Sequence, residues 1–222
     1  VPAPEFFVTI NGVTAANAPA GRIYPSLGKA FHSVAGQVRQ LEMDGVVFDV
    51  YLPSMSGDDV QDLSTTEVTD VGFGDSAKAE LEKMFPELPE ETWDRMEINF
   101  EPGAALDDDG NPANQALILP VPPERIPAPI PAGLSTDLVV SIQAGTDGQF
   151  NSAGGATRFD RPPSVSFPNL SGLAPGQQNL IFWFDHTAGN WEVIGSGTVS
   201  ADGTQIVSDP GVGIEAPGWG FI

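Results

Sequence analysis

The chain has no cysteine and few cationic side chains. Its 222 residues carry 9 Lys and Arg against 30 Asp and Glu, with 2 His, for a formal net charge of -21. The lack of cysteine excludes disulfides, thiolate metal sites and cysteine nucleophiles, and it fits an exported bacterial protein that does not depend on oxidative folding. A surface with this much negative charge repels phosphate backbones and anionic lipids. We therefore expect no nucleic-acid partner.

Long apolar runs are also missing. None reaches the ~20 residues of a membrane-spanning helix, so we expect no membrane insertion. No signal peptide opens the sequence, and its Val-Pro-Ala-Pro start is typical of a mature end or a cut fragment. Apolar residues make up 41% and charged residues only 18%, which favours a folded chain over a disordered one. We expect a secreted or cell-surface location.

Histidine is too scarce to suggest catalysis. A Ser/His/Asp triad would need His32 or His186 beside a serine and a carboxylate. We interpret both as loop or turn histidines with structural partners. Thirty acidic residues make chance carboxylate pairs unavoidable, so such pairs indicate nothing about hydrolysis. We therefore expect no enzymatic activity.

Glycine and proline are abundant, and they separate apolar runs. The 25 Gly and 21 Pro fall between segments of strand character, at roughly the spacing of β-sandwiches. This pattern predicts a mostly β fold, an antiparallel β-sandwich. The strands are expected at 5–10, 46–52, 97–100, 115–121, 137–144, 164–167, 179–185, 191–200 and 204–207.

One short helical insert interrupts the strands, at about 75–96. Helix formers fill its first half, Asp75 or Ser76 can cap it, and two prolines end it before one more short turn. Trp93 and Met96 are expected to fix that turn to the sandwich. The chain is then divided into an N-terminal β region (1–74), the insert, and a β-sandwich core module (97–222), which can also form one continuous domain.

A proline-dense segment follows the strand at 115–121. Residues 120–131 read Pro-Val-Pro-Pro-Glu-Arg-Ile-Pro-Ala-Pro-Ile-Pro, and prolines cannot donate to a β-ladder. We interpret the segment as an extended, polyproline-like crossover between sheets. A ligand for a proline-reading domain is the alternative.

The second part of the chain carries an ordered series of motifs. Phe-Glu-Pro-Gly-Ala-Ala at 100–105, Phe-Asp-Arg-Pro-Pro-Ser-Val-Ser-Phe-Pro-Asn at 159–169, Leu-Ala-Pro-Gly at 173–176 and Phe-Trp-Phe-Asp-His with Gly-Asn-Trp at 182–191 follow one another. The series, over about 96–213, resembles the β-sandwich domain of ankyrins and netrin receptors and related modules of large bacterial surface proteins. That resemblance implies a structural or interaction role.

Two acidic loops suggest a Ca²⁺ site. Asp107, Asp109 and Asn111 place alternating oxygen side chains around a glycine turn, and Ca²⁺ prefers such oxygen ligands. Calcium is the one cofactor that the sequence suggests, and a solvated β-turn is the alternative. A second acidic loop at 58–62 reads more simply as a solvated surface.

Tryptophan could form a sugar-stacking face. Trp183 and Trp191 lie in predicted strands, where core packing is favoured, whereas Trp219 stands in a Gly-Trp-Gly segment where we expect exposure.

Three functions fit these observations. The first is a non-catalytic structural or adhesive module of a secreted or surface microbial protein, with other modules as partners. The second is a self-assembling filament subunit whose segment 2–10 donates a strand to a neighbouring copy. The third is a Ca²⁺-dependent carbohydrate-binding module with glycan partners.

Overall fold

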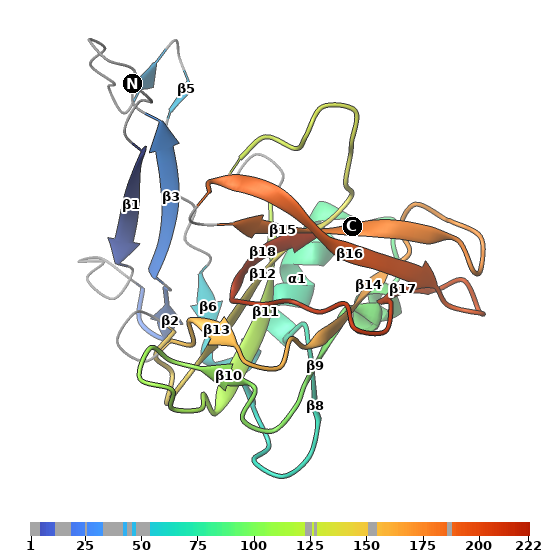
Figure 1. Cartoon of the computed structure of the whole chain (residues 1–222). Helices are drawn as coiled ribbons and strands as arrows, with labels where there is room; N and C mark the ends of the chain where they lie inside the picture. The colour runs from blue at the N-terminus through green and yellow to red at the C-terminus, as the bar shows by residue number, and fades with distance from the viewer. Residues whose placement is uncertain are drawn as a thin grey trace.

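The computed structural model describes residues 5–11, 19–24, 26–32, 42–43, 46–47, 54–122, 126, 128–150, 155–185 and 188–222. Ten of its strands form one antiparallel sheet, called here the main sheet (Figure 1). Their order is β7 (Gln61–Asp62), β11 (Gln115–Val121), β12 (Val139–Gly145), β18 (Gly218–Phe221), β15 (Gln178–Asp185), β16 (Asn190–Val199), β17 (Gln205–Ser208), β14 (Ser164–Pro168), β9 (Glu97–Phe100) and β8 (Thr69–Gly72).

The remaining strands form four two-stranded pairs. Figure 1 shows the first pair at one side of the molecule, beside the main sheet. The prediction of a mostly β, antiparallel fold is confirmed. The pairs are β1 (Glu5–Asn11) with β3 (Ser26–His32), β2 (Arg22–Ile23) with β6 (Met55–Ser56), β4 (Glu42–Met43) with β5 (Val46–Val47), and β10 (Ala105–Leu106) with β13 (Arg158–Phe159).

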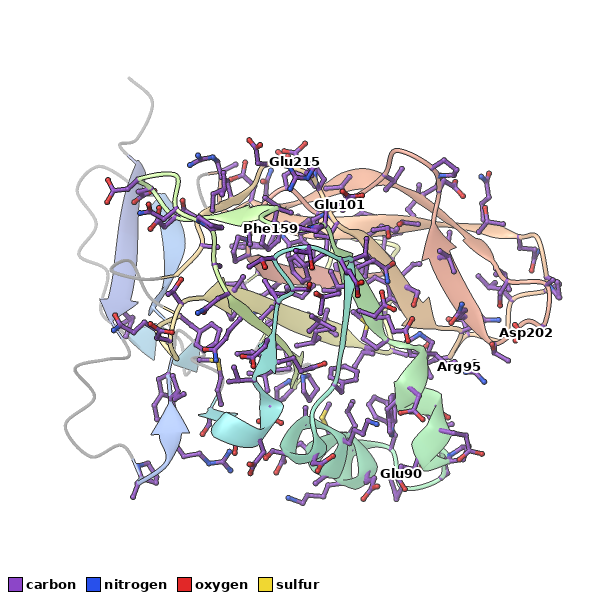
Figure 2. All side chains as sticks on the ribbon, turned by 90° about the horizontal axis from the view of Figure 1, so that it is seen from below. Glu90, Arg95, Glu101, Phe159, Asp202 and Glu215 are labelled. Carbon is purple, nitrogen blue, oxygen red and sulfur yellow. The ribbon has the colours of Figure 1, made fainter. Side chains whose placement is uncertain are left out.

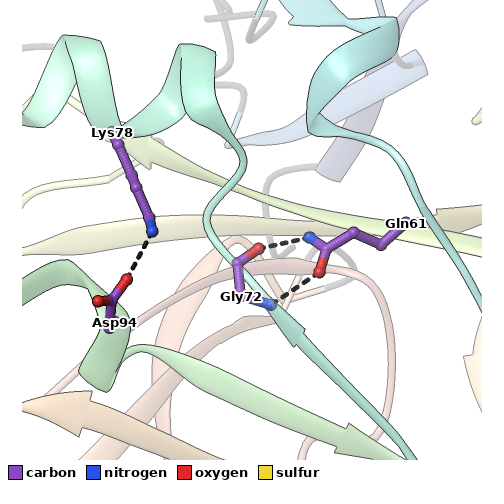
Figure 3. Close-up of polar contacts among 4 residues, drawn as sticks. All are labelled: Gln61, Gly72, Lys78 and Asp94. Carbon is purple, nitrogen blue, oxygen red and sulfur yellow. Dashed lines mark hydrogen bonds and ion pairs between the residues drawn. The ribbon is translucent and has the colours of Figure 1, made fainter.

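The two ends of the main sheet meet. Phe73, just after β8, makes a parallel bridge to Ile118 of β11. Beside it, the Gln61 side chain donates to the Gly72 carbonyl at 2.7 Å and accepts from the Gly72 N–H at 3.3 Å (Figure 3). Because this amide reproduces both bonds of a backbone pair, it joins β7 to β8 where their backbones do not pair.

The main core lies inside the sheet. Alternate residues of each strand point inward, as in β14, where Val165 and Phe167 are buried, and in β9, where Ile98 and Phe100 are buried. Phe100 also meets Phe159 edge to face, with ring centroids 5.3 Å apart. Burial of this apolar surface is the main stabilising term of the fold.

The helical insert consists of two short helices, as the two prolines predict. α1 (Asp75–Met84) ends before Pro86, and a 3₁₀ helix, η3 (Glu90–Arg95), follows Pro89. An earlier 3₁₀ turn, η2, covers Gly57–Asp59. In η3, Trp93 is fully buried in the main core, and Met96 directly after it is buried there too, so the predicted attachment is confirmed.

The predicted cap of α1 is wrong. The N-cap is Gly74 and makes no side-chain hydrogen bond. The buried carboxylate of Asp59 replaces it from η2: Oδ1 accepts from the Ala77 N–H at 3.1 Å, and Oδ2 accepts from the Ser56 N–H at 3.0 Å. A helix N-terminus needs an acceptor for its free N–H groups, and here a distant loop supplies it.

The proline-dense segment is not a crossover between sheets. It joins β11 to β12, which are neighbours in the main sheet. Pro120 is itself part of β11, paired with Val140. On the other side of β11, partners reach only as far as Ile118, so proline stands where one flank of the strand is unpaired.

Three further predictions concern a domain boundary, one strand and membrane insertion. The main sheet includes β7 and β8, so it continues across the boundary predicted at residue 74. Of the strand predicted at 46–52, β5 covers Val46–Val47, and residues 48–53 lie outside the described part. None of the described helices has the length and apolar character needed to cross a lipid bilayer.

Candidate functional sites

The predicted calcium ligands lie in a tight turn between β10 and Pro112. Asp107 accepts from Asn111 twice, at Oδ1 from the backbone N–H (2.7 Å) and at Oδ2 from the side-chain amide (3.0 Å). The Gly110 N–H donates to the Asp107 carbonyl at 3.1 Å, and Arg158 donates to the same carbonyl at 3.1 Å. The side-chain and then the backbone hydrogen bond from Asn111 lower the pKa of Asp107.

These bonds bear on the calcium prediction. The structure brings Asp107 and Asn111 together, but Asn111 uses its amide to hold the Asp107 carboxylate. The Asp109 backbone N–H also interacts with the Asp107 carboxylate and helps to lower its pKa. Within the described ranges, no group of three His, Cys, Asp or Glu side chains is placed to hold a metal ion. Calcium binding here stays a prediction.

The second acidic loop is organised by its own hydrogen bonds. Asp58 accepts from the Ser56 hydroxyl at 3.2 Å, and Asp62 accepts from the Gln115 amide at 3.1 Å. Asp59 is buried and caps α1, as described above. The three carboxylates therefore serve three separate contacts.

The histidines concern the question of a catalytic triad, and β1 concerns the hypothesis that segment 2–10 donates a strand to a neighbouring copy. His32 is the last residue of β3, and neither its side chain nor His186 belongs to the described part. β1 pairs along its whole length with β3 of the same chain, from Glu5 opposite His32 to Asn11 opposite Ser26. Donation of β1 to a second copy would add to this pair or replace it, and it stays a prediction.

A cluster of mostly aromatic side chains, separate from the main core, lies on the outer face of the main sheet. Its rings are in close contact: Phe182 stacks on Phe221 with centroids 4.8 Å apart, and Trp191 meets Phe221 edge to face at 4.8 Å. The expectation that Trp219 is exposed is wrong, since it is only 1% exposed in this cluster. The members are Val121, Val139, Phe182, Phe184, Trp191, Trp219 and Phe221, called here the outer aromatic cluster.

The proline-dense segment covers the outer aromatic cluster. Ile126, Ala128 and Ile130 pack against the rings, at every second position, while the intervening positions are prolines. The Trp191 indole N–H donates to the Ala128 carbonyl at 3.0 Å. The extended backbone that proline favours thus lets alternate side chains seal an aromatic face that would otherwise meet water.

A cavity of about 370 Å³ opens on the other face of β15 and β16. Sequence reasoning missed it, because its walls come from four separate stretches of the chain. Trp183 of β15 and Glu192 of β16 lie directly opposite each other in the ladder, and Glu215 lies in the segment before β18. The lining residues are Thr157, Trp183, Phe184, Asp185, Glu192, Ile194, Glu215, Ala216 and Pro217, and the site is called here the carboxylate cavity.

Comparisons with family models, with curated proteins and with solved structures found no match to this chain. The resemblance to the ankyrin and netrin-receptor β-sandwich over 96–213 therefore stays an expectation from its motifs.

Proposed function

We propose that the chain is a non-catalytic structural or adhesive module of a secreted or cell-surface microbial protein. The observation that carries this proposal is the place of β18 in the main sheet. This strand lies between β12 and β15, and hydrogen-bonds to both. Its Trp219 and Phe221 side chains are buried, each 1% exposed.

Such a strand resists tension. Force along β18 acts parallel to the strands and perpendicular to their hydrogen bonds, so the pairs from Val139 to Ile142 must break together. An edge strand pulled sideways would lose its bonds one at a time. The closure of the main sheet by Gln61 and Gly72 removes one route by which the sheet could open.

The surface and composition support the same role. A net charge of -21 keeps separate molecules apart at low salt and favours solubility outside the cell. The chain has no cysteine, so its apolar cores are held together without disulfides. The module thus holds its shape by packing and hydrogen bonds.

Single-molecule force spectroscopy tests the proposal. Since the chain has no cysteine, two introduced thiols give a defined pulling geometry. Handles at Ser54→Cys and at a cysteine added after Ile222 apply the load through the C-terminal end of β18. Handles at Ser54→Cys and Glu87→Cys, both exposed positions, load the helical insert instead.

We expect a clearly higher unfolding force in the first geometry than in the second. Equal forces, or a lower force through β18, would remove the load-bearing role. Circular dichroism of each variant checks that both start from the same folded state.

A further inference from the structure

The longest open strand edges in the described part of the chain belong to β1 and β3. Each strand has seven residues, and among the described strands the two pair only with each other. The other three pairs outside the main sheet have strands of two residues, and the ends of the main sheet meet through Gln61 and Gly72. A two-stranded pair is at best marginally stable in water, and further strands stabilise it. This pair is therefore where an added strand gains most.

Of the two edges, that of β1 is the one open to another molecule. Figures 1 and 2 both show the pair at one side of the molecule, and in Figure 1 β3 lies between β1 and the main sheet. β3 also contains Gly28 and Lys29, and glycine and lysine both discourage edge pairing. β1, with the sequence Glu-Phe-Phe-Val-Thr-Ile-Asn, has no glycine, proline or lysine, and residues that favour strands fill its centre. Such an unguarded edge is a template for a further strand.

The first 32 residues are nearly free of the acidic side chains that dominate the rest of the chain. They contain one, Glu5, of the 30 in the sequence, together with the two cationic residues Arg22 and Lys29. Two copies with a net charge of -21 each repel one another, and the repulsion is weakest where the negative charge is missing. Ile10 of β1 is 41% exposed, so apolar area is available there for burial between two copies.

We propose that β1 pairs with β1 of a second copy and joins two chains in a symmetric dimer. The two strands run antiparallel about a two-fold axis, and the pairs of both copies form a four-stranded sheet in the order β3, β1, β1, β3. Full overlap of the seven residues places Val8 opposite Val8 of the second copy. The same register places Phe7 opposite Thr9 and Phe6 opposite Ile10, and aromatic residues opposite β-branched ones are favourable cross-strand pairs.

This register avoids a clash of charges. Glu5, the only charged residue of β1, lies opposite Asn11 of the second copy and not opposite another carboxylate. The arrangement differs from donation of the segment 2–10, because each β1 keeps its pairing with its own β3. It goes beyond the load-bearing role and does not depend on it, since β1 lies outside the main sheet.

Size-exclusion chromatography with light scattering on the full chain tests the dimer. Measurements at low salt and in NaCl compare two strengths of repulsion, since the Debye length falls to about 4 Å at about 0.5 M salt. We expect the mass at high protein concentration to rise from that of one chain to that of two as salt is added. A dimer held by opposite charges would weaken with salt instead.

Val8→Lys should abolish the dimer. Val8 lies opposite Lys29 of β3, so this variant places four lysine side chains in one row across the proposed sheet, two of them beside the axis. The matched control is Val68→Lys, the same change at a valine that is 54% exposed and lies outside both strands. It should leave the dimer intact, and circular dichroism checks that both variants remain folded.

A mixture of two variants separates a lost contact from a lost fold. Val8→Glu and Val8→Lys each place like charges opposite one another at the axis, whereas a mixed dimer pairs a carboxylate with an ammonium group. Sedimentation velocity with a dye on the Val8→Lys chain follows the mixed species. We expect the mixture to form about tenfold more dimer than Val8→Lys alone.

Four results would overturn the proposal. They are a wild-type mass of one chain at every salt concentration, a Val8→Lys variant that dimerises like the wild type, a mixture that recovers no dimer, and a loss of the dimer in Val68→Lys. Because the force measurement concerns β18 in the main sheet, a failure of the dimer alone leaves the load-bearing role standing.

Discussion

Asp202 illustrates how single carboxylates hold the turns of this acidic chain. It accepts from the Ser200 hydroxyl at 2.6 Å and from the Thr204 N–H and hydroxyl at 3.1 and 2.9 Å. The Ser200 bond above all, then the two from Thr204, lower the pKa of Asp202 to about 2 from its ordinary value of 3.8. The ionised form is thus the one that the folded turn prefers.

This shift predicts a pH dependence. Because the pKa is lower in the folded state, the stabilisation is complete above the unfolded value of 3.8 and is lost as pH falls toward about 2. Asp202→Asn should reduce stability at pH 7 and make the loss between pH 4 and pH 2 smaller. Urea unfolding at a series of pH values measures both. An unchanged acid limb in the variant would contradict the assignment.

The hydrogen bonds of Asn169 give a structural reason for the asparagine that ends the motif at 159–169. Its side-chain amide donates to the carbonyls of Leu173 and Gly203 at 2.8 and 2.9 Å and accepts from the Leu173 N–H at 3.0 Å. The sequence could point to this asparagine only as part of a Phe-Pro-Asn series. Its two bonds to Leu173 are local, whereas the bond to Gly203 joins this turn to one that is distant in sequence, which no local pattern encodes.

At the scale of elements, the start of α1 depends on a residue outside the helix. Asp59→Asn keeps the volume of the side chain but turns one of two accepting oxygens into a donor that faces an N–H group. We expect a loss of about 2 kcal/mol in the free energy of unfolding, measured by chemical denaturation. Asp75→Asn, an exposed change in the first turn of α1, is the control and should cost under about 1 kcal/mol. Equal losses would mean that Asp59 does not cap the helix.

β18 depends on the absence of a side chain at Gly220. Since an added Cβ would lie 2.2 Å from the Trp183 ring, Gly220→Ala must displace either the indole or the strand. We expect a loss of about 3 kcal/mol in the free energy of unfolding, measured in urea. Gly57→Ala is the control, because a Cβ there meets nothing within 4 Å. A neutral Gly220→Ala would show that β18 is not packed as described.

Some strands can be predicted from the sequence, and others cannot. β11 was predicted with its observed bounds, and β14 within one residue, because apolar runs between turn residues mark them. β18 was missed, since two of its four residues are glycine and read as a turn. Only the position of the Trp183 ring over Gly220 explains why glycine belongs there, and that contact is tertiary. The carboxylate cavity was missed for the same reason.

At the scale of the whole molecule, the contact between Gln61 and Gly72 closes the main sheet. It joins β7 and β8, the first and last strands in the strand order of that sheet. Gln61→Leu removes both bonds to Gly72, which Figure 3 shows beside the ion pair of Lys78 and Asp94. We expect a loss of about 1–2 kcal/mol in the free energy of unfolding and faster hydrogen exchange of the Gly72 amide. Gln205→Leu is the control, a strand glutamine with no side-chain hydrogen bond to the described residues. Unchanged exchange at Gly72 would show that the closure does not depend on Gln61.

The central place of β18 has a practical consequence. Without residues 218–222, β12 and β15 would flank an open slot, and each would present unpaired backbone groups there. A chain shortened to residue 217 and a synthetic peptide of the missing strand are thus natural halves of a split protein. Their reassembly would offer a way to attach a label to this module without any covalent chemistry.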